Sequence, residues 1–414
     1  MKIIISTGQG RLHLMQSAYW LAKRGLSVKI LVGWMPKNCN CLLVQLASRI
    51  VGRDLSAGFV KRCQGGDGCE VVSSAWPEFV DHLLRIVCTK FLHCTTRYVA
   101  AFSWTLLGLN SRRYLRNADI FHVRSGAGHG GAIKAAKKRG MRVLVDHSIA
   151  HPKYMGEYLK DDFLRNGVEF TYELSNPFWR MVIEDCLFAD LLMVNSYFVR
   201  DTFIEAGFDP EKIRVVYLGV RPDFFALRKH TCETQNKVKI LFTGNFGFRK
   251  GAEYFMEIIK CLGDVVGDCF EVDVYGAYID SLPLMSRYKQ YALPIFFHGP
   301  VPQDELKKCL SESDIYLFPS LAEGCASSGM EALAAGLCVV TTKESGLPIT
   351  DGENGFVLPK KDVNAFVEKM RFLISNPKVI DSIGLKAAQL IQNHYTWDQY
   401  AQKTEAIYRE LIGK

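Results

Sequence analysis

Two carboxylates, Glu323 and Glu331, flank a run of small residues that joins a predicted strand at 315–318 to a predicted helix at 330–336. Such a turn leaves the first N–H groups of the helix unpaired, with the positive end of the helix dipole behind them. Phosphate groups bind at helix starts of this kind. Two acids repel phosphate, so they are better suited to bind hydroxyl groups. Phosphate and hydroxyl recognition in one segment indicates a nucleotide sugar.

A purely structural interpretation of the same residues is the alternative. Ser328 and Glu331 have the spacing of a capping box, which would satisfy the start of the helix without any ligand. Glu323 precedes the helix and has no capping role, so it favours the ligand-binding interpretation.

A glycine-flanked loop, from Gly244 to Gly251, follows the first strand of the second half of the chain. It carries Arg249 and Lys250 directly before a predicted helix, and a guanidinium fork beside an ammonium group suits a diphosphate. An exposed basic loop is the alternative. The position at the end of a strand favours a ligand site, because parallel α/β sheets bind ligands there.

Gly8 and Gly10 follow the first predicted strand and raise the question of dinucleotide binding. The GxGxxG spacing is incomplete because position 13 is His13, and no acid follows the second strand to hold a ribose. Both failures argue against NAD. Glycines at this turn would instead let a substrate approach the backbone.

Two histidines of the first half are candidates for substrate contacts. His147 directly follows the predicted strand 142–146, at the end of the sheet where ligands are expected. His129 lies in a glycine-rich loop and is a weaker candidate. The alternative for each is a structural role, which is common for a lone histidine.

Short apolar strands alternate with amphipathic helices along the chain, which is typical of parallel α/β sheets. A chain of 414 residues is too long for one ordinary core. The pattern also restarts after an irregular stretch at 222–237. We therefore expect two Rossmann-like domains, at 1–221 and 222–396, with a ligand site in the cleft between them.

The composition is that of an ordinary globular protein, with 48% hydrophobic and 23% charged residues and a net charge of +8. The charge permits anionic partners without choosing among them. Thirteen cysteines at irregular spacing do not suggest a zinc site. The first residues lack the apolar region of a secretory signal, so we expect reduced thiols and a cytoplasmic location.

The stretch from Arg85 to Ala118 contains no acidic residue and mixes arginines with aromatic and aliphatic side chains. This composition suits a helix that lies on an anionic bilayer, which predicts peripheral contact with the inner face of a membrane. A helical insertion that packs on the core, with a solvated basic face, is the alternative. No known nucleic-acid-binding motif appears, so we expect no nucleic-acid partner.

Five motifs in chain order resemble the retaining glycosyltransferases of the GT-B fold, in the large family-four group. The two acids form its Glu-x7-Glu motif, and Phe242–Gly251 is similar to its phosphate loop. The other three motifs are Val194–Arg200 with Val215–Val220, Ser345–Pro348 with Asp351–Gly355, and Tyr395–Trp397. The resemblance is dense from Leu191 onward, whereas the stretch from about 35 to 115 matches nothing.

The resemblance implies an acceptor-binding N-terminal domain, to which the last helix, 397–414, returns, and a donor-binding C-terminal domain. It implies that Glu323 binds the donor sugar, Glu331 the ribose, and Arg249 and Lys250 the diphosphate. His147 would face the sugar, so Glu323, Lys250 and His147 would act in catalysis. Further donor contacts are implied for Gly244, Gly324, Cys325, Ala326, Ser327 and Ser328, and donor or acceptor contacts for Gly8 and Gly10. Asn245 stands where many members carry arginine, so the resemblance leaves one diphosphate contact open, for which Arg249 is the candidate to compensate.

The activity implied is transfer of a hexose from a UDP- or GDP-sugar to a glycan or lipid-linked acceptor in polysaccharide biosynthesis. The anomeric configuration would be retained, with no metal and no cofactor. The alternatives are another GT-B enzyme such as a nucleotide-sugar epimerase, a non-catalytic GT-B sugar-binding subunit, and a membrane adaptor acting through 85–118. Epimerases of this fold generally lack the Glu-x7-Glu motif, and a non-catalytic subunit would be expected to have lost the donor residues.

Overall fold

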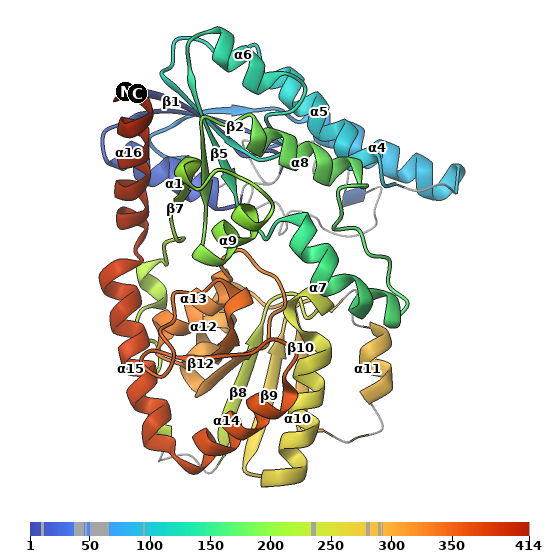
Figure 1. Cartoon of the computed structure of the whole chain (residues 1–414), viewed down its shortest axis with the longest axis vertical. Helices are drawn as coiled ribbons and strands as arrows, with labels where there is room; N and C mark the ends of the chain where they lie inside the picture. The colour runs from blue at the N-terminus through green and yellow to red at the C-terminus, as the bar shows by residue number, and fades with distance from the viewer. Residues whose placement is uncertain are drawn as a thin grey trace.

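The computed structural model describes residues 1–9, 12–36, 45, 48–49, 66–93, 96–232, 237–278, 282–288, 291 and 293–413. The chain forms two α/β domains, one above the other in Figure 1, each built on a parallel β-sheet. The N-terminal sheet has seven strands and the C-terminal sheet has six. The two-domain, doubly wound architecture expected from the sequence is confirmed.

The strands of the N-terminal sheet lie in the order β3-β2-β1-β4-β5-β6-β7. They are β1 (Lys2–Ser6), β2 (Ser27–Val32), β3 (Glu70–Ser73), β4 (Ile120–Arg124), β5 (Arg142–His147), β6 (Leu191–Val194) and β7 (Ile213–Val215). All neighbours are parallel, and the central strands are almost completely buried. Continuous burial is what helices on both faces of a parallel sheet require. The strand order reverses between β1 and β4, so a ligand site is expected at their carboxyl ends.

The strands of the C-terminal sheet lie in the order β10-β9-β8-β11-β12-β13. They are β8 (Val238–Thr243), β9 (Phe270–Tyr275), β10 (Ile295–Gly299), β11 (Ile315–Phe318), β12 (Cys338–Thr342) and β13 (Phe356–Leu358). The order reverses between β8 and β11. The carboxyl ends of these two strands carry the basic loop and the first acid of the Glu-x7-Glu motif.

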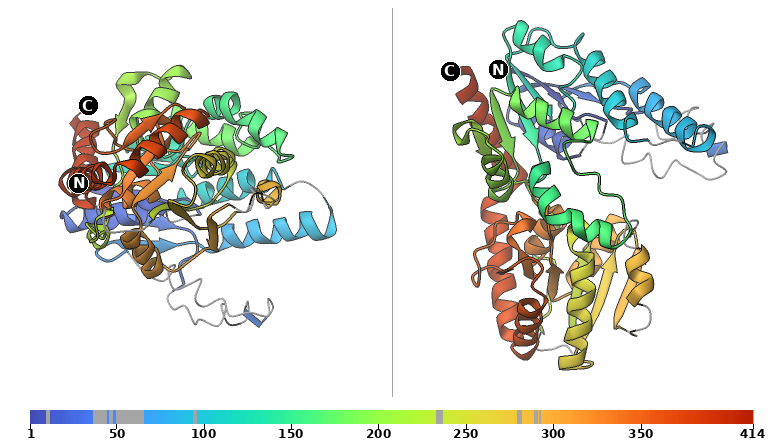
Figure 2. Two further views of the ribbon diagram at one scale, coloured as in Figure 1. Left: turned by 90° about the horizontal axis from the view of Figure 1, so that it is seen from below. Right: turned by 45° about the vertical axis from the view of Figure 1, so that its right-hand side comes forward.

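Helices cover both faces of each sheet (Figures 1 and 2). Those of the first half are α1 (Leu12–Lys23), α4 (Trp76–Ile86), α5 (Val99–Ser111), α6 (Ala132–Lys138), α7 (Pro152–Arg165), α8 (Pro177–Leu187) and α9 (Tyr197–Glu205). Those of the second half are α10 (Ala252–Val266), α11 (Leu282–Tyr288), α12 (Gln303–Glu312), α13 (Ser327–Ala335), α14 (Val363–Ser375), α15 (Pro377–His394) and α16 (Trp397–Gly413).

The last helix, α16, leaves the C-terminal domain and packs on the N-terminal one (Figure 1). Its Tyr400 and Tyr408 share a buried cluster with Leu14 of α1 and Ile5 of β1. At the surface, Glu405 accepts a hydrogen bond of 2.9 Å from Nε of Arg24. The predicted return of the terminal helix is therefore confirmed, and it holds the two domains on one side of the cleft.

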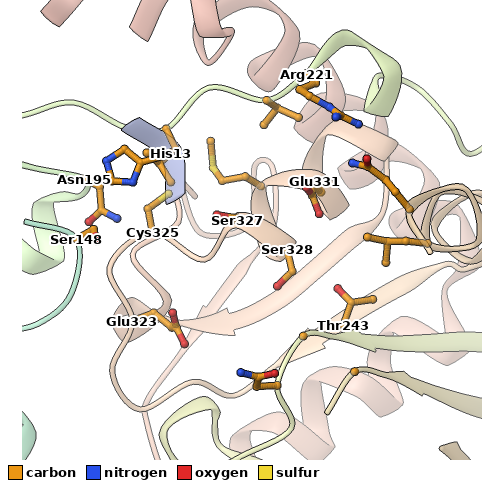
Figure 3. Close-up of a pocket in the computed structure, with 18 of the residues that line it drawn as sticks. His13, Ser148, Asn195, Arg221, Thr243, Glu323, Cys325, Ser327, Ser328 and Glu331 are labelled. Atoms are coloured by element: carbon orange, nitrogen blue, oxygen red, sulfur yellow. The ribbon is translucent and has the colours of Figure 1, made fainter. Parts of the chain in front are cut away.

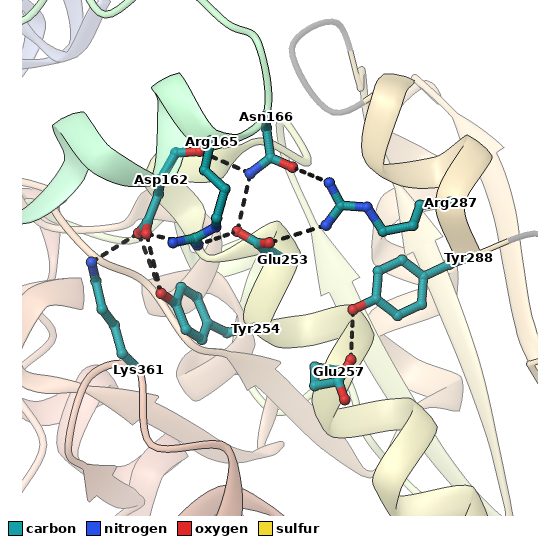
Figure 4. A network of polar contacts seen from close by, with 9 residues as sticks. All are labelled: Asp162, Arg165, Asn166, Glu253, Tyr254, Glu257, Arg287, Tyr288 and Lys361. Carbon is teal, nitrogen blue, oxygen red and sulfur yellow. Dashed lines mark hydrogen bonds and ion pairs between the residues drawn. The ribbon is translucent and has the colours of Figure 1, made fainter.

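A polar network connects the two domains through α7 (Figure 4). Arg165 Nη2 lies 2.8 Å from Glu253 Oε2 of α10, and Lys361 Nζ lies 2.9 Å from Asp162 Oδ2. Asn166 donates a hydrogen bond to the same Glu253 oxygen. The two domains are therefore connected at two places beside the cleft, by α16 and by this network.

Candidate active site

A cleft of about 860 Å³ lies between the domains at the carboxyl ends of both sheets (Figure 3). Its N-terminal wall includes His13, Gln16, Arg124, Ser148 and Asn195. Its C-terminal wall includes Thr243, Gly244, Asn245, Lys250, Tyr275, Gly276, Ala277, Pro300, Val301, Gln303, Glu323, Cys325, Ser327, Ser328 and Glu331. Most of the donor residues implied by the family resemblance therefore lie on one wall.

Three groups suited to an anion converge at the end of β8. Gly244 has a φ of +111°, which favours glycine, and a Cβ there would lie 3.8 Å from both Lys250 Nζ and Ser328 Oγ. The loop brings Lys250 back to this point through a tight turn that ends at Gly251. A Cβ on Gly251 would lie 1.8 Å from the carbonyl oxygen of Pro319, so glycine is required for this close approach. The ammonium, the hydroxyl and an open backbone thus share one corner of the cleft.

Helix α13 begins at this corner without a side-chain cap. Its N-cap residue is Ala326, and the Ser328 hydroxyl is 2.8 Å from the hydroxyl of Tyr316 rather than bonded to a helix N–H. The capping-box interpretation of Ser328 and Glu331 is therefore wrong. Ser328 is the second residue of α13 rather than its N-cap. Its spacing to Glu331 fits the capping motif in the sequence, but its side chain does not cap the helix. The start of α13 remains suited to a negatively charged ligand.

Glu323 is bound by both cations of the basic loop. Its Oε1 lies 2.7 Å from Arg249 Nη1 and 3.0 Å from Lys250 Nζ. Burial alone would raise the pKa of Glu323, but the attraction of Arg249 and Lys250 outweighs it and leaves that pKa below its usual value. Glu323 is therefore an ionised carboxylate in a fixed orientation, able to accept hydrogen bonds from sugar hydroxyls.

Arg249 lies behind Glu323 and is not among the residues of the cleft wall. It donates a hydrogen bond of 2.8 Å to the carbonyl of Ala322, as well as pairing with Glu323. Burial lowers the pKa of Arg249, but the charge of Glu323, the neighbouring Tyr172 and the hydrogen bonds to both together outweigh it, so the pKa is raised and the guanidinium stays charged. Adjacent residues in this turn point in different directions, so Lys250 faces the cleft while Arg249 orients the acid.

Glu331 projects from α13 into the other end of the cleft (Figure 3). Burial raises its pKa to about 7, against a partly compensating attraction from Arg221. Its protonation therefore changes near neutral pH in the unliganded protein.

Gly324 and Ala326 are absent from the described cleft wall, whereas Cys325 and Ser327 belong to it. A Cβ on Gly324 would lie 2.0 Å from the carbonyl oxygen of Ser148, in the other domain. The Gly324 carbonyl also accepts a hydrogen bond from the Ser196 hydroxyl. Glycine at 324 thus allows the two domains to touch directly.

His147 lies beneath the N-terminal wall rather than on it. Its side chain is buried, its Nδ1 is 2.8 Å from the Ser125 hydroxyl, and its ring packs edge-on against Phe203. Burial, followed by the positive charge of Arg124, lowers its pKa to about 3, so the ring is neutral. The neighbouring Ser148 reaches the cleft instead.

The glycine loop after β1 is only partly described. Gly8 is not on the described cleft wall, and a Cβ there would lie 2.6 Å from the ring of Trp104 in α5. The close approach that this glycine permits is therefore to α5. Gly10 lies outside the described residues. His129, the weaker candidate, is half-exposed and away from the wall, 3.9 Å from Glu184.

None of the five N-terminal wall residues named above was predicted as a site residue. Among them, Nε2 of His13 lies 2.9 Å from Asp146 Oδ1, Arg124 ends β4, and Asn195 directly follows β6. The rule that ligands bind at carboxyl ends of strands could have identified Arg124 and Asn195. His13 was noted only because it breaks a dinucleotide motif.

Among the described residues, no three or more His, Cys, Asp or Glu side chains are grouped to hold a metal ion. Within the same residues, no helix is both long and apolar enough to cross a membrane.

The fold and the cleft define a GT-B glycosyltransferase. A family model for Glycosyltransferase Family 4 matches residues 62–224, and one for Glycosyl transferases group 1 matches residues 237–376. Together the two models cover most of the chain, one in each domain. The chain belongs to the group 1, family-four glycosyltransferases.

Two known glycosyltransferases are similar to this chain in sequence, and one solved structure has the same fold. The amylovoran biosynthesis glycosyltransferase AmsK of Erwinia amylovora is 27% identical over 303 residues, 70% of each chain. The putative colanic acid biosynthesis glycosyltransferase WcaL of Salmonella typhimurium is 28% identical over 218 residues, 50% of this chain but only 52% of WcaL. The structure of HepE from Anabaena in complex with UDP matches 99% of this chain and 100% of its own, with a TM-score of 0.63 and 14% identity.

Proposed function

We propose that the protein transfers a hexose from a UDP- or GDP-sugar to a glycan or lipid-linked acceptor, with retention of anomeric configuration and without a metal ion. The observation that carries the proposal is the pairing of Glu323 with Lys250 beside the uncapped start of α13. It combines a hydroxyl-binding carboxylate with two positive features suited to a diphosphate.

The donor would lie along the C-terminal wall. Its diphosphate would contact Lys250, the Ser328 hydroxyl and the start of α13, which lie within one corner. The sugar would bind Glu323, and the ribose would bind Glu331. The base would occupy the part of the cleft lined by Pro300 and Val301.

Catalysis would depend on fixed charges at the leaving group. Lys250 and the dipole of α13 would stabilise the negative charge that develops on the diphosphate, and both are already in position before the reaction. They would supply positive charge at the leaving group without a metal ion. The acceptor hydroxyl would attack the anomeric carbon on the face that the diphosphate leaves, and the departing phosphate oxygen would take its proton. His147 would hold the N-terminal wall in place from behind, through Ser148.

The acceptor would enter from the N-terminal wall, past His13, Arg124 and Asn195. The names of AmsK and WcaL, which refer to amylovoran and colanic acid biosynthesis, support a role in polysaccharide biosynthesis. The UDP bound to HepE supports UDP as the first donor nucleotide to test. Transfer to a growing glycan or a lipid-linked precursor would take place on the cytoplasmic side of a membrane.

The test is incubation of the chain with UDP- and GDP-hexoses, in EDTA, with a mixture of lipid-linked and free oligosaccharide acceptors. NMR of the product reports the anomeric configuration, through the H1–H2 coupling for gluco- and galacto-configured hexoses and through the one-bond C1–H1 coupling for manno-configured ones. An α-linked product from an α-linked donor would support the proposal. A β-linked product would contradict retention, and an epimerised nucleotide sugar would favour the epimerase alternative.

A further inference from the structure

The α4–α5 hairpin projects from the N-terminal domain (Figures 1 and 2) and has an inverted distribution of polar and apolar side chains. The two acids of α4, Glu78 and Asp81, are buried, with exposed fractions of 6% and 8%. Asp81 accepts hydrogen bonds of 2.8 Å from the Ser103 hydroxyl of α5 and from Nε of Arg85. The acidic side chains of α4 therefore face α5 and the interior of the domain rather than solvent.

The opposite face of α4 is apolar and exposed to solvent. Its exposed residues recur at intervals of three and four, which places them in one stripe along the helix. They are Trp76, Phe79, Leu83 and Ile86. Phe79 is 67% exposed. Further exposed apolar residues follow at Phe91, which is 73% exposed, at Leu92 and Tyr98, and at Phe102 of α5. A monomeric soluble protein rarely leaves a contiguous apolar surface of this kind uncovered.

Two basic residues accompany this surface. No acidic residue occurs between Arg85 and Ala118, and Lys90 and Arg97 lie on the chain between α4 and α5. Arg97 also donates a hydrogen bond of 3.0 Å to the Ser175 hydroxyl and attracts the carboxylate of Glu173. The arginines at the end of the same stretch belong elsewhere. Arg113 and Arg116 line a separate hollow with Lys2, at the amino ends of the first strands. The predicted basic segment 85–118 is thus divided, and only its first part accompanies the apolar face, which begins nine residues earlier at Trp76.

The base of the hairpin lies at the carboxyl ends of β1 and β2. The Glu78 carboxylate lies against Gly33, where a Cβ would be 2.0 Å from its Oε1. Trp104 of α5 packs on Gly8. The hairpin therefore connects its exposed tip with the glycine loop on the acceptor side of the N-terminal sheet.

We infer that the apolar face of the α4–α5 hairpin docks on an anionic lipid bilayer. Apolar side chains would enter the interface, and Lys90 and Arg97 would contact anionic headgroups, an arrangement typical of helices that lie in a membrane surface. The hairpin would then bring the acceptor side of the cleft close to the membrane. This inference goes beyond the proposed transfer reaction, and it holds for either donor nucleotide.

The test is co-sedimentation of the full chain with vesicles of phosphatidylcholine alone or mixed with phosphatidylglycerol at a 7:3 ratio. F79S/F91S removes two exposed rings without leaving a buried cavity, and we expect at least a tenfold weaker partition on the mixed vesicles. The matched control is F372S/L385S, which changes two exposed apolar residues of the C-terminal domain and should leave partition unchanged.

A second variant tests the charge component. K90Q/R97Q should weaken partition on the mixed vesicles by about fivefold for each charge removed. Equal binding of wild type and F79S/F91S would overturn the inference. A second outcome would also overturn it. In that outcome, the wild-type chain binds neither kind of vesicle and forms dimers, and the F79S/F91S variant is monomeric. Calorimetric titration of the same variants with UDP, which should be unchanged, separates this outcome from failure of the donor site.

Discussion

The two walls of the cleft differ in how closely their residues depend on one another. On the C-terminal wall, Glu323 and Lys250 come from two loops and Ser328 from the first turn of α13, and they lie within contact of one another or of Gly244. On the N-terminal wall, His13 and Arg124 reach the cleft, while His147 supports it from below. In the proposed function, the C-terminal wall binds a diphosphate and a sugar, which require fixed charges and hydrogen-bond acceptors and so restrict the residue types. The N-terminal wall is proposed to bind the acceptor, whose hydroxyl group requires no such charged cluster.

The largest expected effect comes from the carboxylate at the centre of the C-terminal wall. E323Q keeps the shape of the side chain but removes its charge, so transfer should fall by roughly 10²–10³-fold. Circular dichroism and thermal melting should show an intact fold. The control E368Q alters an exposed acid of α14 and should retain activity. Full activity of E323Q, measured as nucleotide release, would remove Glu323 from the catalytic site.

Substitutions of the adjacent cations Arg249 and Lys250 should have different effects on UDP binding, because only Lys250 faces the cleft. K250A removes a charged contact to the diphosphate and should weaken UDP binding by roughly tenfold or more. R249Q should leave UDP affinity nearly unchanged but lower the transfer rate, because Glu323 loses one of its two partners. Isothermal titration calorimetry with each variant measures the difference. Equal loss of UDP affinity in both would mean that Arg249 also binds the diphosphate.

The titration of Glu331 should appear in both stability and binding. Its pKa is raised from the unfolded value of 4.5 to about 7, so the folded state holds a proton that the unfolded state releases. This contribution to stability is complete below pH 4.5 and is lost as the pH rises through 7. Relative to E331Q, the unliganded wild type should therefore melt progressively lower between pH 5 and 8.

Donor binding should show the opposite trend, because a ribose diol donates to the ionised form of Glu331. Wild-type affinity for UDP, divided by that of E331Q, should rise up to about tenfold from pH 6 to pH 8. Comparison with E331Q cancels the titration of UDP itself. A flat ratio would place the ribose away from Glu331.

A smaller effect is expected on the N-terminal wall. H13Q preserves a hydrogen-bond donor toward Asp146 but changes the group that faces the cleft. It should raise the KM for the acceptor by about fivefold, near the 1 kcal/mol of a single hydrogen bond, and leave UDP affinity unchanged. A change in UDP affinity with an unchanged acceptor KM would assign His13 to the donor.

The smallest effect should come from the lateral network of α7 (Figure 4). R165Q removes an exposed ion pair with Glu253, so the free energy of unfolding should fall by less than about 1 kcal/mol. Urea unfolding measures this change. A loss of several kcal/mol would show that the network, rather than α16, holds the domains together.

The sequence was sufficient for most of the fold. The strand at 315–318 was predicted with the bounds observed, because a short continuous apolar run is typical of a buried parallel strand. The α4–α5 hairpin was not recognised from periodicity. Its apolar stripe faces outward, and a helical pattern alone does not say which side the core is on.

The sequence predicted which strand ends carry the site, but not which side chains at those strand ends point into the cleft. Arg249 and Lys250 are neighbours, and the sequence does not tell which one faces the cleft. His147 ends β5, yet the backbone turns its ring inward and exposes Ser148. These choices depend on the turn geometry and on packing across the domain boundary, as at Gly324.

The most direct test of the donor site is calorimetric titration of the wild-type chain and K250A with UDP and GDP in EDTA. The account predicts metal-free binding of one nucleotide to the wild type, with 1:1 stoichiometry and a clear loss of affinity in K250A. Binding that appears only after a divalent metal is added, or that K250A leaves unchanged, would contradict a diphosphate site built from Lys250 and the start of α13.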